Sequence, residues 1–146
     1  MTRELIINCP YYLLSRASLA MTSRLKRALA DAGYASVRPA YMGVLLCLWT
    51  QDGQQVGELG RCAGLEPSTM TGLLDRMERD GLLTRSPDPE DRRAWRVHLT
   101  EEGQRAREAM DTVVNDHLAT MMEGVPAEHV EIFKDTLRQV LANAAR

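Results

Sequence analysis

The sequence predicts a mainly α-helical protein that carries one small β-hairpin. Apolar residues recur at helical spacing in several segments, and glycine or proline separates these segments. Only one short stretch, near residue 95, alternates in the way that a strand does. Because a two-stranded hairpin alone is marginally stable in water, we expect this one to pack against the helices that precede it.

Composition limits the possible functions. The 146 residues suit one compact protomer, and no apolar run is long enough to span a bilayer. The first residues lack the pattern of a secretory signal, so we expect a cytoplasmic protein without a membrane partner. The formal net charge of −2 does not favour nucleic-acid binding, so any case for it must rest on local charge.

The sequence suggests no chemistry that needs a metal, a cofactor or a nucleophile. Cys9, Cys47 and Cys62 are widely separated and form no CxxC motif, which indicates neither a disulfide framework nor a metal site. We expect all three to be small hydrophobic side chains. The histidines fall on different elements and no phosphate-binding loop is present, so we expect no enzyme activity.

The first helix should run from Pro10 to Ala32, and Gly33 should end it. Its apolar face carries Leu14, Met21, Leu25 and Leu29. Such a stripe on a long terminal helix is typical of pairing with another chain. A second helix should start near Pro39, with the following residues on its buried side: Tyr41, Val44, Leu45, Leu48 and Trp49.

Two short helices then follow, joined by a tight turn at Gly64. The first spans Val56–Ala63, and the second begins at Pro67 and closes at Gly81. This is a helix-turn-helix arrangement, in which the second helix enters the DNA major groove. The outward residues of the second helix include Ser68, Thr69 and Thr71. Short hydroxyl side chains reach phosphates or base edges, although both Ser68 and Thr69 could instead be capping residues, and we expect one of them to cap the helix.

A charged hairpin follows, with strands at Leu82–Arg85 and Trp95–Leu99. Arginines cluster near its tip with carboxylates lying among them: Arg85, Asp88, Glu90, Asp91, Arg92, Arg93 and Arg96. Such a tip is often only solvated, yet an arginine held out by a carboxylate can enter a narrow minor groove. Thr100 should cap a fifth helix that runs to Met122, and Pro126 should start a last one.

In this order the residues resemble the MarR family of winged helix-turn-helix regulators. The stretches VGELGRCAGLEPSTMTGLLDRMERDGLLTR and DPEDRRAWRVHLTEEG carry a resemblance that covers nearly the whole chain. It implies a winged helix-turn-helix with N- and C-terminal dimerisation helices. The implied parts are a dimerisation helix over 1–34, a DNA-binding lobe over 35–100 and dimerisation helices over 101–146.

The resemblance also implies a function. Two copies would bind double-stranded DNA as a homodimer, at a near-palindromic site whose half-sites lie about one helical turn apart. In most cases such a regulator is a repressor. By this resemblance Ser68, Thr69 and Thr71 meet the major groove, and Arg76 contacts the DNA backbone or braces the wing.

The wing roles rest on the same resemblance. Arg93 matches the arginine that enters the minor groove, Asp91 matches the acid that orients it, and Arg92 is expected at a phosphate. An opposing hypothesis uses the same fold to bind protein, and the acidic pI of about 5.9 favours it. Duplex binding that depends on salt would separate the two hypotheses.

Regulators of this family lose DNA affinity when a small molecule or an oxidant changes the spacing of the two recognition helices. The resemblance implies an effector cleft between the dimer helices and the DNA-binding lobe. The candidate residues for it are Tyr11, Tyr12, Arg16, Tyr41 and Trp49. An arginine near aromatic rings could hold a small aromatic or phenolic effector, although tyrosines at a helix interface more often only pack.

One branch of the family senses organic hydroperoxides through a first-helix cysteine that is hydrogen-bonded to tyrosines. This makes Cys9 a candidate redox residue. However, Tyr11 falls where that branch has its cysteine, and a displacement of two residues rotates a side chain by about 200° on a helix.

Overall fold

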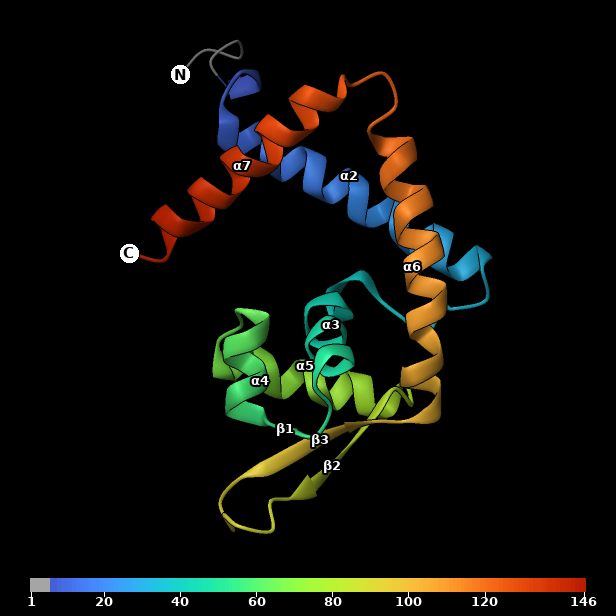
Figure 1. Ribbon diagram of the computed structural model, residues 1–146, viewed down its shortest axis with the longest axis vertical. Coiled ribbons are helices and arrows are strands. Elements are labelled where there is room, and N and C mark those ends of the chain that lie inside the picture. Colours follow the sequence, from blue (N-terminus) through green and yellow to red (C-terminus); the bar gives the residue numbers. More distant parts are fainter. Residues whose placement is uncertain (1–5) are drawn as a thin grey trace.

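The computed structural model describes residues 6–146, which form two groups of elements joined by one long helix (Figure 1). In chain order the elements are α2 (Pro10–Asp31), η1 (Pro39–Tyr41), α3 (Met42–Thr50), β1 (Gln54–Gln55), α4 (Val56–Ala63), α5 (Pro67–Arg79), β2 (Leu83–Pro87), β3 (Trp95–Leu99), α6 (Glu101–Met121) and α7 (Ala127–Ala144). We call residues 39–99 the sheet lobe, and α2 with α7 the helical arm. Helix α6 rises from the sheet lobe to the arm, and α7 folds back across α2 (Figure 1). Over 6–146, no helix is both long and apolar enough to cross a membrane.

The hydrophobic core lies in the sheet lobe. It is built from the apolar faces expected for the second and fourth helices together with the hairpin: Tyr41, Val44, Leu45, Leu48, Met70, Leu73, Leu74, Met77, Leu82, Leu83 and Val97 are buried. Leu29 and Ala106 join this core from α2 and α6. Because α5 is buried along its inner face, its position is set by the core, and its outer face is free for other contacts.

The sheet has three strands in the order β1-β3-β2, whereas the sequence predicted a two-stranded hairpin. Gln54 pairs with Val97 and Gln55 with Arg96, so β1 adds an antiparallel edge to β3. A strand of two residues is too short to show the alternation by which strands are recognised. This extra edge anchors the hairpin to the chain segment that opens α4.

A close approach at Gly103 holds α6 against the sheet lobe. A Cβ at this position would collide with the Leu82 carbonyl, so only glycine allows the contact. Thr100 caps α6 by accepting from the Gly103 amide at 3.1 Å, and its hydroxyl donates to the Gly81 carbonyl at 2.6 Å. The capping threonine and the glycine therefore dock the first turn of α6 onto the start of the hairpin.

The helical arm exposes apolar side chains. In α7 no residue is buried, and Ile132 and Leu141 are 62% and 70% exposed. In the predicted apolar stripe of α2, Leu29 is buried and Leu14 is 41% exposed, while the two stripe residues between them are half-buried. The stripe that the sequence predicted thus exists and is partly covered within a single chain, whereas most apolar side chains of α7 are exposed.

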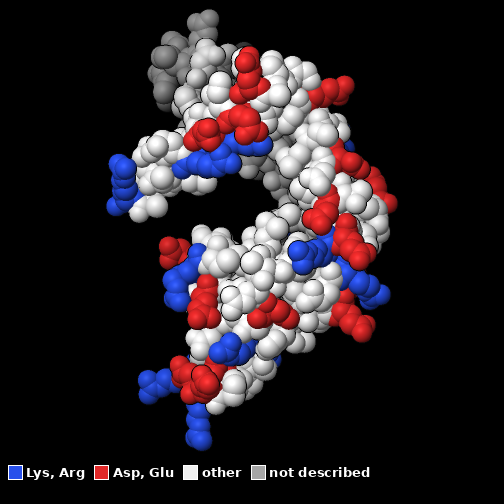
Figure 2. All heavy atoms as spheres, viewed as in Figure 1, with Lys and Arg blue, Asp and Glu red and all other residues white. Residues whose placement is uncertain are grey.

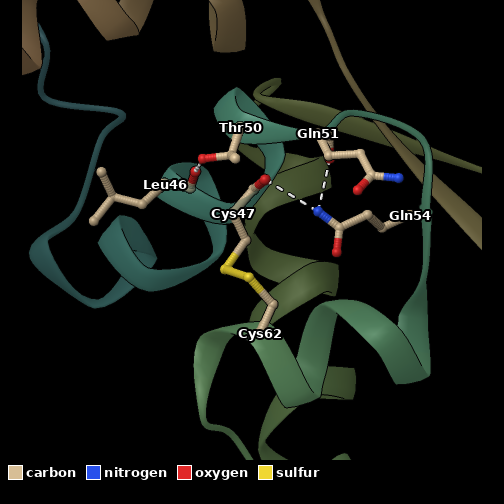
Figure 3. The surroundings of a disulfide bond; sticks show 6 residues. All are labelled: Leu46, Cys47, Thr50, Gln51, Gln54 and Cys62. Atoms are coloured by element: carbon tan, nitrogen blue, oxygen red, sulfur yellow. Dashed lines mark hydrogen bonds between the residues drawn. A yellow bond between two sulfur atoms is a disulfide. The ribbon is translucent and has the colours of Figure 1, made fainter.

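The expectation for two of the cysteines was wrong. Cys47 on α3 and Cys62 on α4 form a disulfide bond, with their Cα atoms 6.2 Å apart (Figure 3). Cys62 was also expected to be buried, and it is exposed. The spacing of 15 residues does not reveal this pairing, because it depends on how α4 packs against α3. Cys9, directly before α2, is a free and half-buried thiol.

Candidate nucleic-acid interface

The N-terminal turn of α5 is open. Its N-cap residue is Glu66, whose side chain makes no capping hydrogen bond, and Pro67 occupies the first turn. Ser68 and Thr69 lie within the helix and are exposed, so neither is the N-cap residue, as one of them was expected to be. The first amides of an α-helix have no acceptor within it. Hydroxyls and free amides therefore stand together at this end of α5.

One turn further on, the surface of α5 is formed by Thr71, Gly72 and Arg76. The Thr71 hydroxyl donates to the Pro67 carbonyl at 3.2 Å, which leaves its oxygen able to accept a hydrogen bond. Arg76 is exposed, and a Cβ at Gly72 would lie 3.5 Å from its Nη1 atom. The Arg76 guanidinium therefore lies along the helix surface beside Gly72.

The hairpin tip is built around Asp88, which the sequence placed at the tip without indicating its role. Its carboxylate accepts from Gln55 Nε2 at 2.8 Å and from the amides of Glu90 and Asp91, and it pairs with Arg96 Nε at 2.7 Å. The hydrogen bond from Gln55, followed by those of the backbone amides, lowers the pKa of Asp88 to about 2. A side chain that is only 3% exposed therefore organises the whole tip as an anion.

Asp91 holds the tip through the backbone. Its Oδ1 accepts from the Arg93 amide at 3.0 Å, as in a turn in which an aspartate bonds two residues ahead. Arg92 and Arg93 are both exposed. The acid that was expected to orient Arg93 therefore fixes the main chain of this arginine.

A bridge connects α5 to the hairpin. Arg85 Nη2 on β2 lies 2.7 Å from Asp75 and 2.8 Å from Glu78, and the Arg85 amide donates to Glu78 as well. The hydrogen bond from Arg85 lowers the pKa of Glu78, and the same bond raises the pKa of Arg85. The sequence interpretation considered Arg76 for this bracing role, whereas the contacts come from Asp75 and Glu78.

A groove of about 790 Å³ runs between α5 and the hairpin. Its walls include Thr71 from the helix and Arg85 and Arg93 from the hairpin. Figure 2 shows basic side chains projecting from the hairpin tip, at the bottom of the view, with acidic ones between them. The structure therefore brings a predicted helix residue and a predicted hairpin residue to the walls of one groove.

The five candidate effector residues lie in two regions. Tyr41 is buried and its hydroxyl donates to Asp80 at 2.6 Å, while Trp49 Nε1 donates to the Gly103 carbonyl at 2.8 Å. Tyr11, Tyr12 and Arg16 are exposed at the start of α2. The groove beside the hairpin and the hollows between α2 and α6 and between α2 and α7 are lined by other residues.

The chain is similar to known regulators in sequence and in structure. Residues 38–95 match the model described as "MarR family". The chain is 36% identical over 107 residues to the uncharacterised HTH-type transcriptional regulator YsmB of Bacillus subtilis (strain 168), which is 73% of each protein.

Two solved structures are similar over nearly their full length. The PcaV transcriptional regulator of Streptomyces coelicolor, in complex with its natural ligand, is 25% identical with a TM-score of 0.83, and 100% of both chains is covered. The transcriptional repressor CouR, bound to a 23-mer DNA duplex, is 25% identical with a TM-score of 0.78, over 100% of this chain and 99% of the other.

Proposed function

The chain belongs to the MarR family of winged-helix, DNA-binding transcriptional regulators, and on this premise we propose that it is a sequence-specific repressor that binds a near-palindromic duplex as a homodimer. The observation that supports this proposal most strongly is the groove between α5 and the hairpin, which is lined by both Thr71 and Arg93. For a helix to enter the major groove while a hairpin tip contacts the DNA beside it, the helix surface and the hairpin tip must lie next to each other in this way.

The residues of α5 supply base and phosphate contacts in this proposal. Ser68, Thr69 and Thr71 face the major groove, where their hydroxyls meet base edges. The uncapped amides at the start of α5 suit a DNA phosphate, because the helix dipole favours an anion there. Arg76 contacts the DNA backbone from the same surface.

The hairpin supplies the contacts beside the major groove. Arg93 enters the adjacent minor groove, and Arg92 meets a phosphate. Asp91 and Asp88 hold the backbone of the tip, so both arginines are presented with little loss of conformational freedom. The net charge of −2 does not oppose this proposal, because the contacts come from a local arrangement of basic groups.

The exposed apolar side chains of the helical arm support the proposed dimer. A helix such as α7, which buries no residue within its own chain, is stabilised when a second copy covers it. In this proposal the dimerisation region comprises residues 1–34, of which the structure describes 6–34, and residues 101–146, on either side of the lobe at 35–100. Two lobes related by a twofold axis read two equivalent half-sites, so the DNA site is near-palindromic.

An effector is also part of the proposal. PcaV was solved with its natural ligand, and we infer that this chain likewise responds to a small aromatic or phenolic molecule. The candidate ligand contacts are Tyr11, Tyr12 and Arg16, which are exposed on α2, together with Tyr41 and Trp49 in the sheet lobe. Because Tyr41 and Trp49 already donate to Asp80 and Gly103, they donate to a ligand only if these bonds are exchanged. A ligand shifts DNA affinity only through unequal affinity for the two arrangements of the lobes.

Selection from a pool of random duplexes at low salt tests the proposal. We expect enrichment of one motif with inverted half-sites, and light scattering of the selected complex should give two chains per duplex. A variant that carries Thr69→Ala and Thr71→Ala serves as the control, since it keeps the fold but changes the reading surface. No enrichment for the native chain, or one chain per duplex, would overturn the proposal.

A further inference from the structure

The disulfide bond between Cys47 and Cys62 lies inside the sheet lobe and joins α3 to α4. Neither cysteine takes part in the proposed DNA or effector contacts. Cys47 is 8% exposed on α3, whereas Cys62 is an exposed residue in the last turn of α4. Figure 3 shows the disulfide bond that joins the two helices. The residue at one end of the bond is thus covered by the protein, and the residue at the other end lies at the surface. A disulfide can exchange with a thiol only where a sulfur atom is accessible, so any reaction enters from Cys62.

We propose that Cys47 and Cys62 form a reversible thiol–disulfide exchange site for low-molecular-weight thiols and disulfides, and that this bond controls the DNA affinity of the sheet lobe. The second half of this inference rests on the proposed function, and the first half stands on the accessibility of Cys62 alone.

The reaction balances in two steps. A small thiolate attacks Sγ of Cys62, the S–S bond breaks, and Sγ of Cys47 leaves as a thiolate that takes a proton from water. A second small thiolate attacks the small-molecule sulfur of the mixed disulfide, and Cys62 is released as a thiol. Two small thiols are oxidised to one disulfide while the protein disulfide is reduced, and a small disulfide drives the reverse reaction.

The Cys62 end of the bond is connected to α5 through α4. Cys62 belongs to α4, which packs between α3 and α5 at Gly60: a Cβ on this glycine would lie 3.3 Å from Met70 Cγ of α5. Gly64, with φ of 66°, ends α4 two residues after Cys62, and α5 begins at Pro67. The bond therefore fixes the helix on which α5 rests.

The Cys47 end of the bond is connected to the hairpin through Gln54. The Cys47 carbonyl accepts from Gln54 Nε2 at 3.0 Å, and Gln54 pairs with Val97 of β3 (Figure 3). The next residue, Gln55, donates to Asp88 at the hairpin tip. The helix α5 and the hairpin, which both line the groove, thus connect to the cross-linked pair, and reduction is expected to loosen their relative placement.

The first experiment counts thiols in a full-length Cys9→Ser chain, which removes the free cysteine from the assay. Treatment of the folded chain with excess reduced glutathione should release two thiols per chain, and oxidised glutathione should remove them again. Should glutathione release none from the folded chain, while the denatured chain releases two, the exchange site is refuted.

The second experiment compares oxidised and reduced Cys9→Ser chains on a duplex from the selection above. We expect the reduced form to melt roughly 5–10 °C lower, as loss of a cross-link over a loop of this size implies. We expect it to bind about three- to tenfold more weakly, because the reading elements are less pre-organised. A Cys47→Ser/Cys62→Ser chain should match the reduced form under both conditions.

The outcomes separate the two claims. Equal melting and equal affinity of the two redox forms would refute control by the bond, even if exchange occurs. Should the double variant fail to fold, the chemically reduced Cys9→Ser chain still decides the question. If neither form binds any duplex, the proposed function and the claim about affinity both fail, whereas thiol counts and melting still decide the exchange site.

Discussion

The hydroxyl of Tyr41 donates a hydrogen bond of 2.6 Å to the carboxylate of Asp80. Tyr41 ends η1, and Asp80 is the residue directly after α5. Arg38 Nε lies 3.2 Å from the same carboxylate oxygen. The end of the proposed reading helix is therefore fastened to the segment that enters the sheet lobe from α2. These two contacts are a direct polar connection between the segment that follows α2 and the end of α5.

Replacing Tyr41→Phe should destabilise the fold by about 1–2 kcal/mol, because a buried charge-assisted hydrogen bond is lost while the ring remains. Urea unfolding measures the change. Tyr34→Phe is the matched control, since Tyr34 is a half-buried tyrosine packed against the same core. Equal midpoints for the two variants would show that the bond to Asp80 contributes nothing to stability.

The same variant should alter stability at high pH. Burial, and then the hydrogen bond and charge of Asp80, raise the pKa of Tyr41 above its ordinary value of 10.0. The unfolded tyrosine loses its proton first, so the native contribution is complete below pH 10.0 and is lost as the pH rises through the folded pKa. Unfolding of Tyr41→Phe should depend less on pH above 10.0 than unfolding of the native chain. Parallel curves would contradict the assignment.

Asp88→Asn should weaken duplex binding, because the amide cannot accept all the hydrogen bonds that close the hairpin tip. It should also change acid stability. The pKa of Asp88 is lowered from 3.8 to about 2, so its contribution is present above pH 3.8 and is lost as the pH falls toward 2. Acid titration of unfolding should show a shallower loss for Asp88→Asn in this window. Asp116→Asn, on the exposed surface of α6, provides the comparison.

Arg85→Met should reduce duplex affinity several-fold and leave the dimer intact, because it cuts the bridge from the hairpin to α5. Its effect on stability should stay within about 1 kcal/mol, since Asp75 and Glu78 remain partly solvated. Arg105→Met removes an exposed ion pair within α6 and serves as the control. Fluorescence anisotropy with the selected duplex distinguishes them, and equal affinities would show that the bridge does not position the hairpin.

Thr69→Ala and Thr71→Ala should each change the preferred DNA sequence more than the salt dependence of binding. A residue at a base edge selects among sequences, whereas a residue at a phosphate contributes to the salt slope. Repeating the duplex selection with each variant, and measuring affinity at several salt concentrations, separates these roles. An unchanged motif with a reduced slope would reassign the threonine to a phosphate.

Local sequence signals predicted most of the fold. Pro67, Gly64 and the apolar face of α5 specify a helix and its start, and the structure confirms them. The alternation in Trp95–Leu99 likewise predicted β3. The two-residue strand β1 carries no periodicity, and the Cys47–Cys62 bond depends on helix packing, so neither could be read from the sequence.

The candidate site was predictable to a similar degree. The outward hydroxyls of α5 and the arginines at the hairpin tip can be recognised in the sequence by residue type and spacing. The residues that position them are not: Asp88, Gln55 and Glu78 act through tertiary contacts with partners up to 33 residues away. A signal for Asp88 existed in the run Asp-Pro-Glu-Asp, because aspartate often accepts from amides two or three residues ahead.

The central claim is that α5 and the hairpin tip of two chains lie on one duplex, and the affinity of Arg93→Ala for the selected duplex tests it most directly. Measured at matched salt, beside the native chain and an Arg138→Ala control on α7, this variant should bind roughly ten- to a hundredfold more weakly, while light scattering still gives a dimer. Native affinity for Arg93→Ala, with the dimer intact, would contradict the account.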